Sequence, residues 1–414
     1  MRRIIKFIVS AGEMAGIYLY WRLRGDAFQP LQAGQSCKIL VFGYCGLGDM
    51  IFLLPTLEHL RRSFPQGRIT IITGPRSAAN ELVQETHADK HWSIDWTRAS
   101  WSERLAVCRR IREQNFDACL VSYPNPVRFF LLGLFTIPRR VGHCRRLVCN
   151  YPLGLKWLKT KFYSAIWEEE MYRSFLFNKR ILININQSER HDVQKNLEMA
   201  ISLHPDAAPA IQDGPHLAIP AASRQFAASL LQNAGGGNNA PIALSLGVSR
   251  QMDWKRWKIQ KFAHLLEKIN QKFPSSLLLL GTSEETGLNE EFRRYYKGPI
   301  IDALGKSNVY QTAALLEQCR LFVGNDCGPA KLAMALGIPT AIIWGPSDRQ
   351  GAGPWKKGPF KTIHNNMPCS PCFAAGMLKM GEGVINHTNC GHHNCLRELT
   401  VDFAYRQIEE LLKK

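Results

Sequence analysis

The segment Leu321–Gly337 carries the residues of this chain best suited to hold an anion. An apolar run ends at Asp326, and a Gly328-Pro329 turn then opens a helix of small residues. A helix start presents unpaired backbone N–H groups and the positive end of the helix dipole. In an open parallel sheet, ligands bind at this position beyond the carboxyl end of a strand. We therefore predict a site for a phosphate-bearing substrate, while Asp326 acting as a plain N-cap stays open.

The next expected strand, Ile338–Trp344, is followed by Gly345–Asp348, which is the pattern of another helix start. Two helix starts at adjacent strand ends would form one concave pocket rich in N–H donors. This neighbouring turn strengthens the prediction of an anion site.

A glycine-rich stretch, Gly43–Asp49, lies between the expected first strand and first helix. Glycines there let the backbone turn tightly and approach a ligand closely. The order G-x-x-G-x-G is not the dinucleotide fingerprint, and the second strand runs into Arg76 without an acidic residue, which argues against a nicotinamide or flavin cofactor. Asp49 stands at the helix start, where it can cap the helix or face a substrate.

Two other strand ends carry polar residues. In Leu246–Trp257, Lys255 could contact phosphate as a mobile charge, or the segment could be a solvated loop anchored by Trp257. In Gly281–Glu285, the carboxylate of Glu284 could accept hydrogen bonds from a sugar or ribose hydroxyl, or it could simply begin a helix.

The spacing Cys369-x2-Cys372 is followed by Cys390-x4-Cys395, with histidines nearby. Four such thiolates could hold a structural zinc ion, although the second spacing is wider than usual. A structural metal, a redox-labile cluster and free thiols all remain open, and a catalytic zinc is not expected. The other cysteines are mostly scattered singly, which indicates a reducing compartment.

The length of 414 residues favours two domains. The net charge is +18, from 52 Lys and Arg less 34 Asp and Glu, and it suits nucleic acid, an acidic membrane surface or phosphorylated substrates. Residues 1–24 read as an amphipathic helix, because Lys6 and Glu13 interrupt an apolar stretch that would otherwise resemble a signal peptide or a membrane span. This helix could lie on an anionic bilayer or pack on the protein itself.

Strand and helix patterns alternate from residue 38 to 122 and again from 242 to 344, which predicts two parallel α/β sheets. We expect an amphipathic extension at 1–35, a first domain at 36–215, a second domain at 216–400 and a terminal helix at 401–414. The predicted strands are Lys38–Phe42, Arg68–Thr73, His91–Asp95, Phe116–Ser122, Ile242–Leu246, Ser276–Leu280, Ile300–Ala303, Leu321–Gly324 and Thr340–Trp344.

Taken together, these segments resemble glycosyltransferase family nine, the lipopolysaccharide heptosyltransferases, from Lys38 to the C-terminus. The resemblance is carried by Gly46-Leu-Gly48-Asp49, Lys255-x-Trp257 and Gly324–Pro329 continued by Gly345–Asp348, and by the Cys-x2-Cys and Cys-Leu-Arg ending. It implies the GT-B architecture: two facing Rossmann-like domains, the first binding an acceptor and the second a nucleotide sugar, with the active site in the cleft between them.

The resemblance also implies roles for individual residues. Asp49 would be the general base, on an acceptor-side loop that contains Gly46 and Gly48. Lys255 and the N–H groups around Cys327–Pro329 would stabilise the departing diphosphate, so that no cofactor or divalent metal is required. The donor-binding set would be Ser249, Lys255, Glu284, Asp326, Cys327, Gly328, Pro329 and Lys331.

The chain departs from the family pattern at two of these positions. Lys331 stands where many members have histidine, and Cys327 where they have threonine or serine. A lysine adds positive charge near the phosphates but cannot accept a hydrogen bond, and a thiol is a poor substitute for a hydroxyl donor.

The leading hypothesis is an inverting transferase that moves heptose from ADP-heptose onto a lipopolysaccharide core. Its partners would be a nucleotide sugar, an anionic glycolipid and the inner-membrane surface, with no nucleic acid, and its place the cytoplasm, peripheral to that membrane. One alternative is a transferase of the same fold that uses another nucleotide sugar for other envelope glycans. The other is a non-catalytic glycan- or nucleic-acid-binding protein, which would have no need of Asp49.

Overall fold

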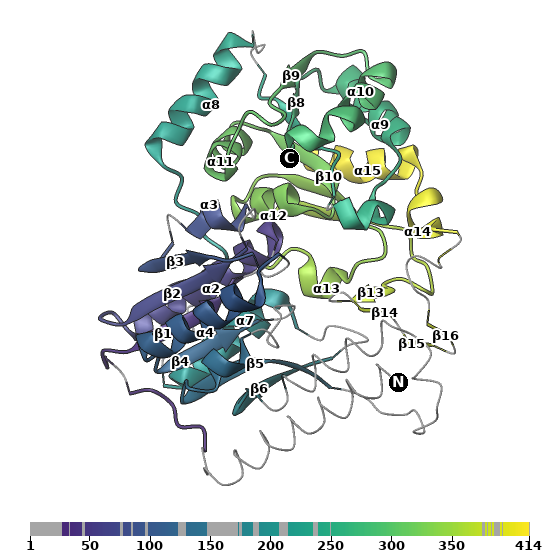
Figure 1. The fold of residues 1–414 in the computed structure, drawn as a ribbon. Helices are drawn as coiled ribbons and strands as arrows, with labels where there is room; N and C mark the ends of the chain where they lie inside the picture. The colour runs from purple at the N-terminus through teal and green to yellow at the C-terminus, as the bar shows by residue number, and fades with distance from the viewer. Residues whose placement is uncertain are drawn as a thin grey trace.

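The computed structural model forms two α/β domains that lie against each other, with the C-terminal domain above the N-terminal one in Figure 1. It describes residues 27–413 apart from 33, 44–45, 75–77, 84–85, 96–97, 123–129, 147–172, 174–175, 185–189, 207–213, 235–238, 249, 375–376, 379, 382, 385–389 and 391. The helix expected at residues 1–24 lies outside the described residues.

The first domain is built on a six-stranded parallel sheet with the order β3-β2-β1-β4-β5-β6. Its strands are β1 (Lys38–Phe42), β2 (Arg68–Thr73), β3 (Lys90–Ser93), β4 (Ala118–Val121), β5 (Arg139–Arg146) and β6 (Lys179–Asn184). The first four were predicted from apolar runs. Strands β5 and β6 were missed. Strand β5 has a pair of arginines at each end and therefore reads as a solvated basic segment.

Helices cover both faces of this sheet. One face carries α2 (Leu47–Ser63), α3 (Ala79–Val83) and α7 (Asp192–Leu203), whose apolar residues share a buried cluster with one side of β1 and β4. The opposite face carries α4 (Trp101–Gln114) and α5 (Leu131–Leu134), which pack in a second cluster with the other side of the same strands.

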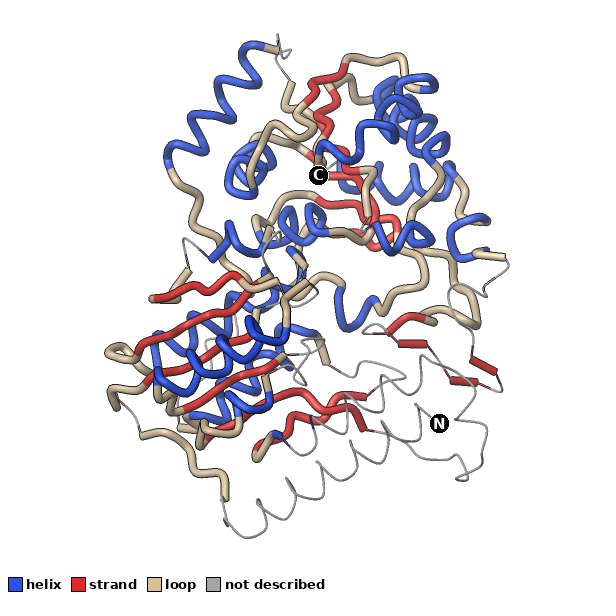
Figure 2. Tube along the Cα trace, viewed as in Figure 1, coloured by secondary structure: helices blue, strands red, loops and turns tan. Residues whose placement is uncertain are grey.

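The second domain repeats the plan with the order β12-β11-β10-β7-β8-β9. Numbered within each domain, both sheets have the order 3-2-1-4-5-6 of the Rossmann fold. The strands, drawn in red in Figure 2, are β7 (Ile242–Ser245), β8 (Leu277–Leu279), β9 (Ile300–Asp302), β10 (Leu321–Asn325), β11 (Thr340–Ile343) and β12 (Phe360–Ile363). Only β12 among them was not predicted.

The helices of this domain also divide between two faces. Those that share a core with α2 and α7 are α8 (Ala221–Asn233), α11 (Val309–Glu317) and α12 (Gly328–Ala335). Those on the other face include α9 (Ile259–Lys272), α10 (Thr286–Tyr295) and α15 (Val401–Leu412). The terminal helix α15 packs on α9 and β12 within this domain.

The second domain also contains shorter elements. They are η2 (Arg250–Lys255), η3 (Ser283–Glu285), α13 (Arg349–Ala352), α14 (Asn394–Arg397) and the two-residue strands β13 (Phe373–Ala374), β14 (Met377–Leu378), β15 (Met380–Gly381) and β16 (Gly383–Val384).

A single buried apolar cluster runs through both domains. Helix α12 packs on α2, and α11 packs on α3, so the apolar residues of the first domain meet those of the second. Two hydrogen bonds reinforce the α3–α11 contact. Glu81 Oε2 accepts from the backbone N–H of Val309 at 2.7 Å, and the Tyr310 hydroxyl donates to the carbonyl of Leu82 at 2.9 Å.

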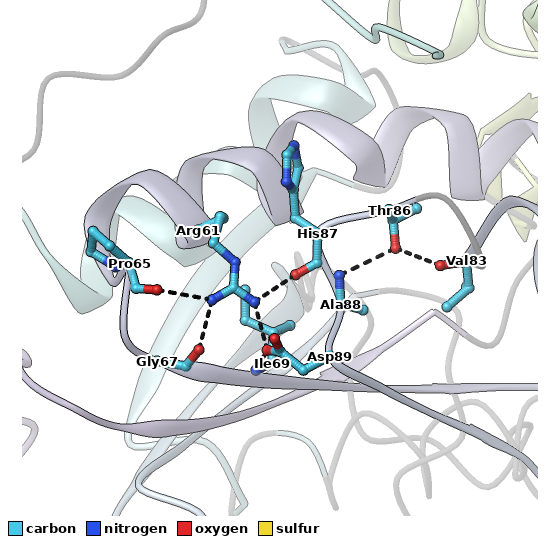
Figure 3. Close-up of polar contacts among 9 residues, drawn as sticks. All are labelled: Arg61, Pro65, Gly67, Ile69, Val83, Thr86, His87, Ala88 and Asp89. Carbon is cyan, nitrogen blue, oxygen red and sulfur yellow. Dashed lines mark hydrogen bonds and ion pairs between the residues drawn. The ribbon is translucent and has the colours of Figure 1, made fainter. Parts of the chain in front are cut away.

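The far end of α2 is anchored by Arg61 (Figure 3). Its guanidinium donates to the carbonyl oxygens of Pro65, Gly67 and His87, and to the carboxylate of Asp89 at 2.5 Å. The same carboxylate accepts the backbone N–H of Ile69 at 2.7 Å. This network ties α2 to β2 and to the loop before β3, and so fixes the helix whose other end carries Asp49.

Candidate active site

The predicted site residues follow strands at the centre of each sheet. In the order 3-2-1-4-5-6 the topology reverses between β1 and β4 in the first domain and between β7 and β10 in the second. Ligands of open α/β sheets bind at this switch point, outside the carboxyl ends of the strands. Asp49 follows β1, Lys255 follows β7 and Asp326 follows β10, so all three lie where the fold predicts a ligand.

Asp49 occupies the third position of α2, and its side chain caps the start of that helix. Its Oδ2 accepts the backbone N–H of Gly46 at 3.2 Å. The carboxylate remains accessible, yet desolvation by the surrounding protein and the nearby carboxylate of Asp192 raise its pKa to about 6. The bond from Gly46 and the ammonium groups of Lys255 and Lys331 act in the opposite direction. The capping role and a chemical role are therefore compatible in one side chain.

The start of α2 faces the start of α12 across the domain boundary. A Cβ atom on Gly48 would lie 3.0 Å from Cγ of Lys331, and one on Gly328 would lie 2.9 Å from the side chain of Leu47. The two glycines thus allow a close approach between the helices. This approach brings Asp49 of the first domain within electrostatic reach of two lysines of the second.

Asp326 is buried between these two lysines. Its Oδ2 lies 2.6 Å from Nζ of Lys255, and its Oδ1 lies 2.6 Å from Nζ of Lys331. Burial alone would raise the pKa of Asp326, but the two ammonium groups outweigh it and hold the pKa well below its usual range. We call these three residues the Lys–Asp–Lys group; two ammonium charges against one carboxylate leave it with a net positive charge.

Lys331 is held more firmly than the sequence suggested. Besides Asp326, its Nζ donates to the carbonyl of Ala352 at 2.5 Å and lies 4.3 Å from the ring centroid of Trp344. The side chain is buried and also approaches Phe52 of α2. Its charge therefore acts from a fixed position at the domain boundary.

Two helix starts lie at the ends of adjacent strands, as predicted. Helix α12 begins at Gly328, with Cys327 as N-cap and Pro329 in the first turn. The Cys327 side chain does not cap the helix; its Sγ lies 3.9 Å from the Ser245 hydroxyl, and burial raises the pKa of the thiol to about 11. After β11, Asp348 caps α13 by accepting the N–H of Gln350 at 3.1 Å.

Asn325 is a positioning residue that the sequence did not reveal. It is fully buried; its Oδ1 accepts the N–H of Trp257, and its Nδ2 donates to the carbonyl of Leu246, both at 2.9 Å. It thereby joins the end of β10 to the loop that carries Lys255. Trp257 is also fully buried, so the loop has the packing anchor that was proposed for it. Ser249 lies outside the described residues.

Of the two neighbouring glutamates after β8, Glu284 is exposed on η3, and Glu285 is the one that turns inward. The carboxylate of Glu285 packs against Gly247 and Gly281, and a Cβ atom on either glycine would clash with it. Burial raises the pKa of Glu285, with an opposing effect from Arg256. A carboxylate thus adjoins the loop after β7, one residue later than predicted.

The start of α7 forms another part of this region that sequence reasoning missed. His191 caps α7 by accepting the N–H of Val193 on Nδ1 at 3.1 Å, and its Nε2 donates to the carbonyl of Gly353 in the second domain at 2.9 Å. Its ring packs against Phe52 and Trp355, two residues that line a small cavity beside Lys331. The signal was a polar residue before an apolar helical period, in a segment left unassigned.

The four cysteines near the C-terminus lie near one another. Burial raises the pKa of Cys395 to about 11, and the neighbouring Cys372, Cys390 and Cys369 raise it further. Within the described ranges, however, no three His, Cys, Asp or Glu side chains stand in the arrangement of metal ligands.

Comparison with known proteins agrees with this fold and site. The family model for glycosyltransferase family 9 (heptosyltransferase) matches residues 156–379, which is more than half of the chain. Lipooligosaccharide heptosyltransferase 2 of Haemophilus ducreyi is 22% identical over 395 residues, covering 91% of this chain and 99% of that protein. The protein of the same name from Haemophilus influenzae is 24% identical over 391 residues, covering 91% and 100%.

Among solved structures, the ADP-heptose heptosyltransferase II of Escherichia coli superposes with a TM-score of 0.64 at 18% identity, covering 91% of this chain and 98% of that one. The two facing parallel α/β domains are those of the GT-B fold. The chain belongs to glycosyltransferase family 9, the heptosyltransferases, and is a glycosyltransferase. Among the helices that the structure describes, none is both long enough and apolar enough to cross a bilayer.

Proposed function

We propose that this protein transfers heptose from ADP-heptose to a sugar of a lipopolysaccharide core, with inversion at the anomeric carbon. One observation carries the proposal: the Asp49 carboxylate, with a pKa raised to about 6, stands opposite the cationic Lys–Asp–Lys group of the other domain. A base and an anion-binding group then flank the position of the reacting carbon. The named relatives act as lipooligosaccharide heptosyltransferases, which supports this choice of sugar and acceptor.

In this mechanism Asp49 takes the proton of the acceptor hydroxyl as its oxygen attacks the anomeric carbon. A new carbon–oxygen bond forms on one face of that carbon while the bond to the diphosphate breaks on the other, which inverts the centre. A raised pKa suits a base that must be ionised near neutral pH and still accept a proton.

The second domain stabilises the charge that develops on the leaving diphosphate. Lys255 and Lys331 supply positive charge, and the N–H groups at the start of α12 lie at the same strand end. These protein groups can take the part that a divalent cation plays in other transferases, so we propose that no metal takes part in the transfer step. Glu284 or its inward-turned neighbour Glu285 would accept hydrogen bonds from donor hydroxyls.

The acceptor would be an anionic glycolipid at the inner face of the inner membrane, with the enzyme in the cytoplasm. The net charge of +18 favours such a partner. We also propose a structural zinc ion on Cys369, Cys372, Cys390 and Cys395, because thiolates are preferred zinc ligands and the other three cysteines lie close enough to Cys395 to raise the pKa of its thiol. The ion would have to draw these side chains together, since they do not stand as metal ligands in the described structure. Metal analysis should find zinc in the purified protein and none after all four are replaced by serine; equal contents in both would refute this.

Replacing the proposed base tests the function directly. Asp49→Asn should lower the rate of heptose transfer by roughly a hundredfold to ten-thousandfold, because proton removal is lost. Binding of ADP-heptose, measured by calorimetry, should remain nearly unchanged. Asp402→Asn, on the exposed start of α15, is the matched control and should transfer normally. Unchanged turnover in Asp49→Asn would remove Asp49 from the mechanism.

A further inference from the structure

Large exposed apolar side chains gather on one side of the first domain. Among the described residues, the exposed large apolar side chains of this domain are Trp101 (78% exposed), Leu132 (64%), Leu105 (49%) and Leu182 (46%). Trp101 is three-quarters exposed at the start of its helix, so it buries little apolar area, and its contact with the Arg104 guanidinium lies at the surface. The group therefore needs an explanation outside the core.

All four lie on the same face of the sheet. Trp101 and Leu105 are one turn apart on α4, and Leu132 is on α5, which packs on α4 where Gly133 meets Cys108. Leu182 of β6 is in register with Cys144 of β5, and Cys144 belongs to the core cluster beneath α4 and α5. Because residues in register on parallel strands point to the same face, Leu182 points to this side too. We call this surface the α4–α5 face.

The α4–α5 face is also basic. Arg109 and Arg112 of α4 are exposed; Arg112 lies on the stripe formed by Trp101 and Leu105, and Arg109 lies one turn beyond Leu105. Arg180 of β6 is exposed on the same side, since it is in register with Gly142. Of the two glutamates of α4, Glu103 is held in the helix cap by Ser100. Positive charge around exposed tryptophan and leucine matches the chemistry of an anionic lipid surface.

We propose that the α4–α5 face docks the enzyme on an anionic bilayer. Tryptophan and leucine would enter the headgroup region, and the arginines would contact lipid phosphates. This face is the side of the sheet opposite to α2 and α7, so docking would leave Asp49 and the domain boundary uncovered. The proposal rests on the proposed function only in assuming that the acceptor is borne by a lipid. We favour a bilayer over a protein partner because the exposed apolar residues are spread over two helices and a strand at the edge of the described sheet.

Vesicle flotation with the full-length protein tests the proposal. The probes are vesicles of phosphatidylcholine mixed with phosphatidylglycerol, and vesicles of phosphatidylcholine alone. Trp101→Ser/Leu105→Ser should bind the anionic vesicles about tenfold or more weakly than the unaltered protein, because its buried apolar area is lost. Arg109→Ala/Arg112→Ala should lose roughly fivefold per charge, and on anionic vesicles only. The control Tyr295→Ser/Phe403→Ser, which alters exposed side chains of the second domain, should float normally.

The outcomes separate this proposal from the proposed function. Transfer to a lipid-free acceptor should be equal in the unaltered protein and in all these variants, and a loss there would concern the transferase chemistry. Normal flotation of Trp101→Ser/Leu105→Ser, or no flotation of the unaltered protein, would overturn the docking proposal. So would unchanged flotation together with a shift from dimer to monomer in sedimentation, since the face would then bind a second copy.

Discussion

At the residue scale, Asp49 combines its capping role with the proposed role as general base because of its position in α2. Its bond from Gly46 fixes the carboxylate at the helix start, where the other domain comes close. The same closeness desolvates it, so the fold that orients the side chain also sets its proton affinity. The pH dependence of the reaction should report this.

We expect the acidic limb of the pH–rate profile to lie near the pKa of Asp49, which is about 6. The proposed base works when it is ionised, so kcat/KM should rise as the pH passes upward through this value and should fall below it.

Asp49→Asn removes a carboxylate whose charged form is disfavoured by desolvation, so the thermal stability of this variant at pH 8 should equal or exceed that of the unaltered protein. This gain should vanish as the pH falls from about 6 towards the ordinary value of 3.8, because the native carboxylate then takes up its proton. A difference in thermal stability that does not change with pH across this range would contradict the raised pKa of Asp49, and a kcat/KM that does not change there would contradict its role as the base.

Two neighbouring charges should move that limb in opposite directions. Asp192 raises the pKa of Asp49 and Lys331 lowers it. Asp192→Asn should therefore shift the acidic limb to lower pH, and Lys331→Met should shift it to higher pH. Pre-steady-state or kcat/KM profiles of both variants would show the shifts. Two shifts of the same sign would mean that the variants act by general disruption of the fold and not by charge.

The sequence was sufficient to predict the place of some of these residues in the fold, but not the place of others. Asp49, Lys255 and Asp326 each follow an apolar strand, and such positions converge at the switch point of the sheet. The pairing of Asp326 with two lysines depends on side-chain directions that spacing does not fix. Asp192 and Asn325 were missed because they act on the site through other residues, and Glu285 because adjacent glutamates look alike in sequence.

At the scale of elements, the start of α7 is the part of the site that depends most on the arrangement of the two domains. His191 caps α7 with one ring nitrogen and reaches Gly353 with the other. Burial lowers the pKa of His191, with a further effect from Lys331, so the ring is neutral at pH 7 and can accept and donate at once. Few other side chains can perform both tasks.

Replacements of His191 should separate its two bonds. His191→Ala should lower the free energy of unfolding by about 1–2 kcal/mol, because the cap is lost. His191→Asn should recover most of this loss, since asparagine is a good N-cap, but its shorter side chain should not restore the bond to Gly353. Denaturant unfolding measures the first effect, and hydrogen exchange at the loop that contains Gly353 measures the second. Equal stability of the two variants would argue against the capping role.

Elements were predicted well where the pattern was apolar and poorly where it was charged. The apolar sequence of β10, Leu-Phe-Val-Gly-Asn, predicted a strand, whereas the basic sequence of β5, Arg-Arg-Val-Gly-His-Cys-Arg-Arg, did not. Its charge is tolerated because Arg140 is buried against backbone carbonyls of Leu176 and Ile137. The partner Leu176 lies 36 residues further along the chain, so the local sequence gives no sign of it.

At the scale of the whole molecule, the two sheets were predicted, and their union by one apolar cluster was not. The apolar stripes of α2, α11 and α12 indicate burial, but a stripe does not say which domain it will meet. The contact of α12 with α2 and the bond of His191 to Gly353 hold the domains with Asp49 facing the Lys–Asp–Lys group. Donor binding should strengthen this arrangement.

A thermal-shift panel of nucleotide sugars should therefore identify the donor. A ligand that binds only the folded state at about 100 times its Kd stabilises by about 2.7 kcal/mol. ADP-heptose should give the largest rise in Tm, and Lys255→Ala should reduce that rise at the same ligand concentration, while Asp402→Asn should not. A larger rise with another nucleotide sugar would keep the fold and the reaction but reassign the donor.

The shared core also bears on how the chain is made. In the described part of the chain, α2 packs on α12 and α3 packs on α11, and these two helices of the second domain follow more than a hundred positions after α7. Synthesis proceeds from the N-terminus, so the first half leaves the ribosome with this apolar surface exposed to water until the second half has been made. If the two halves are expressed as separate fragments, the apolar surface of each fragment stays exposed. Each fragment expressed alone should therefore be prone to aggregate.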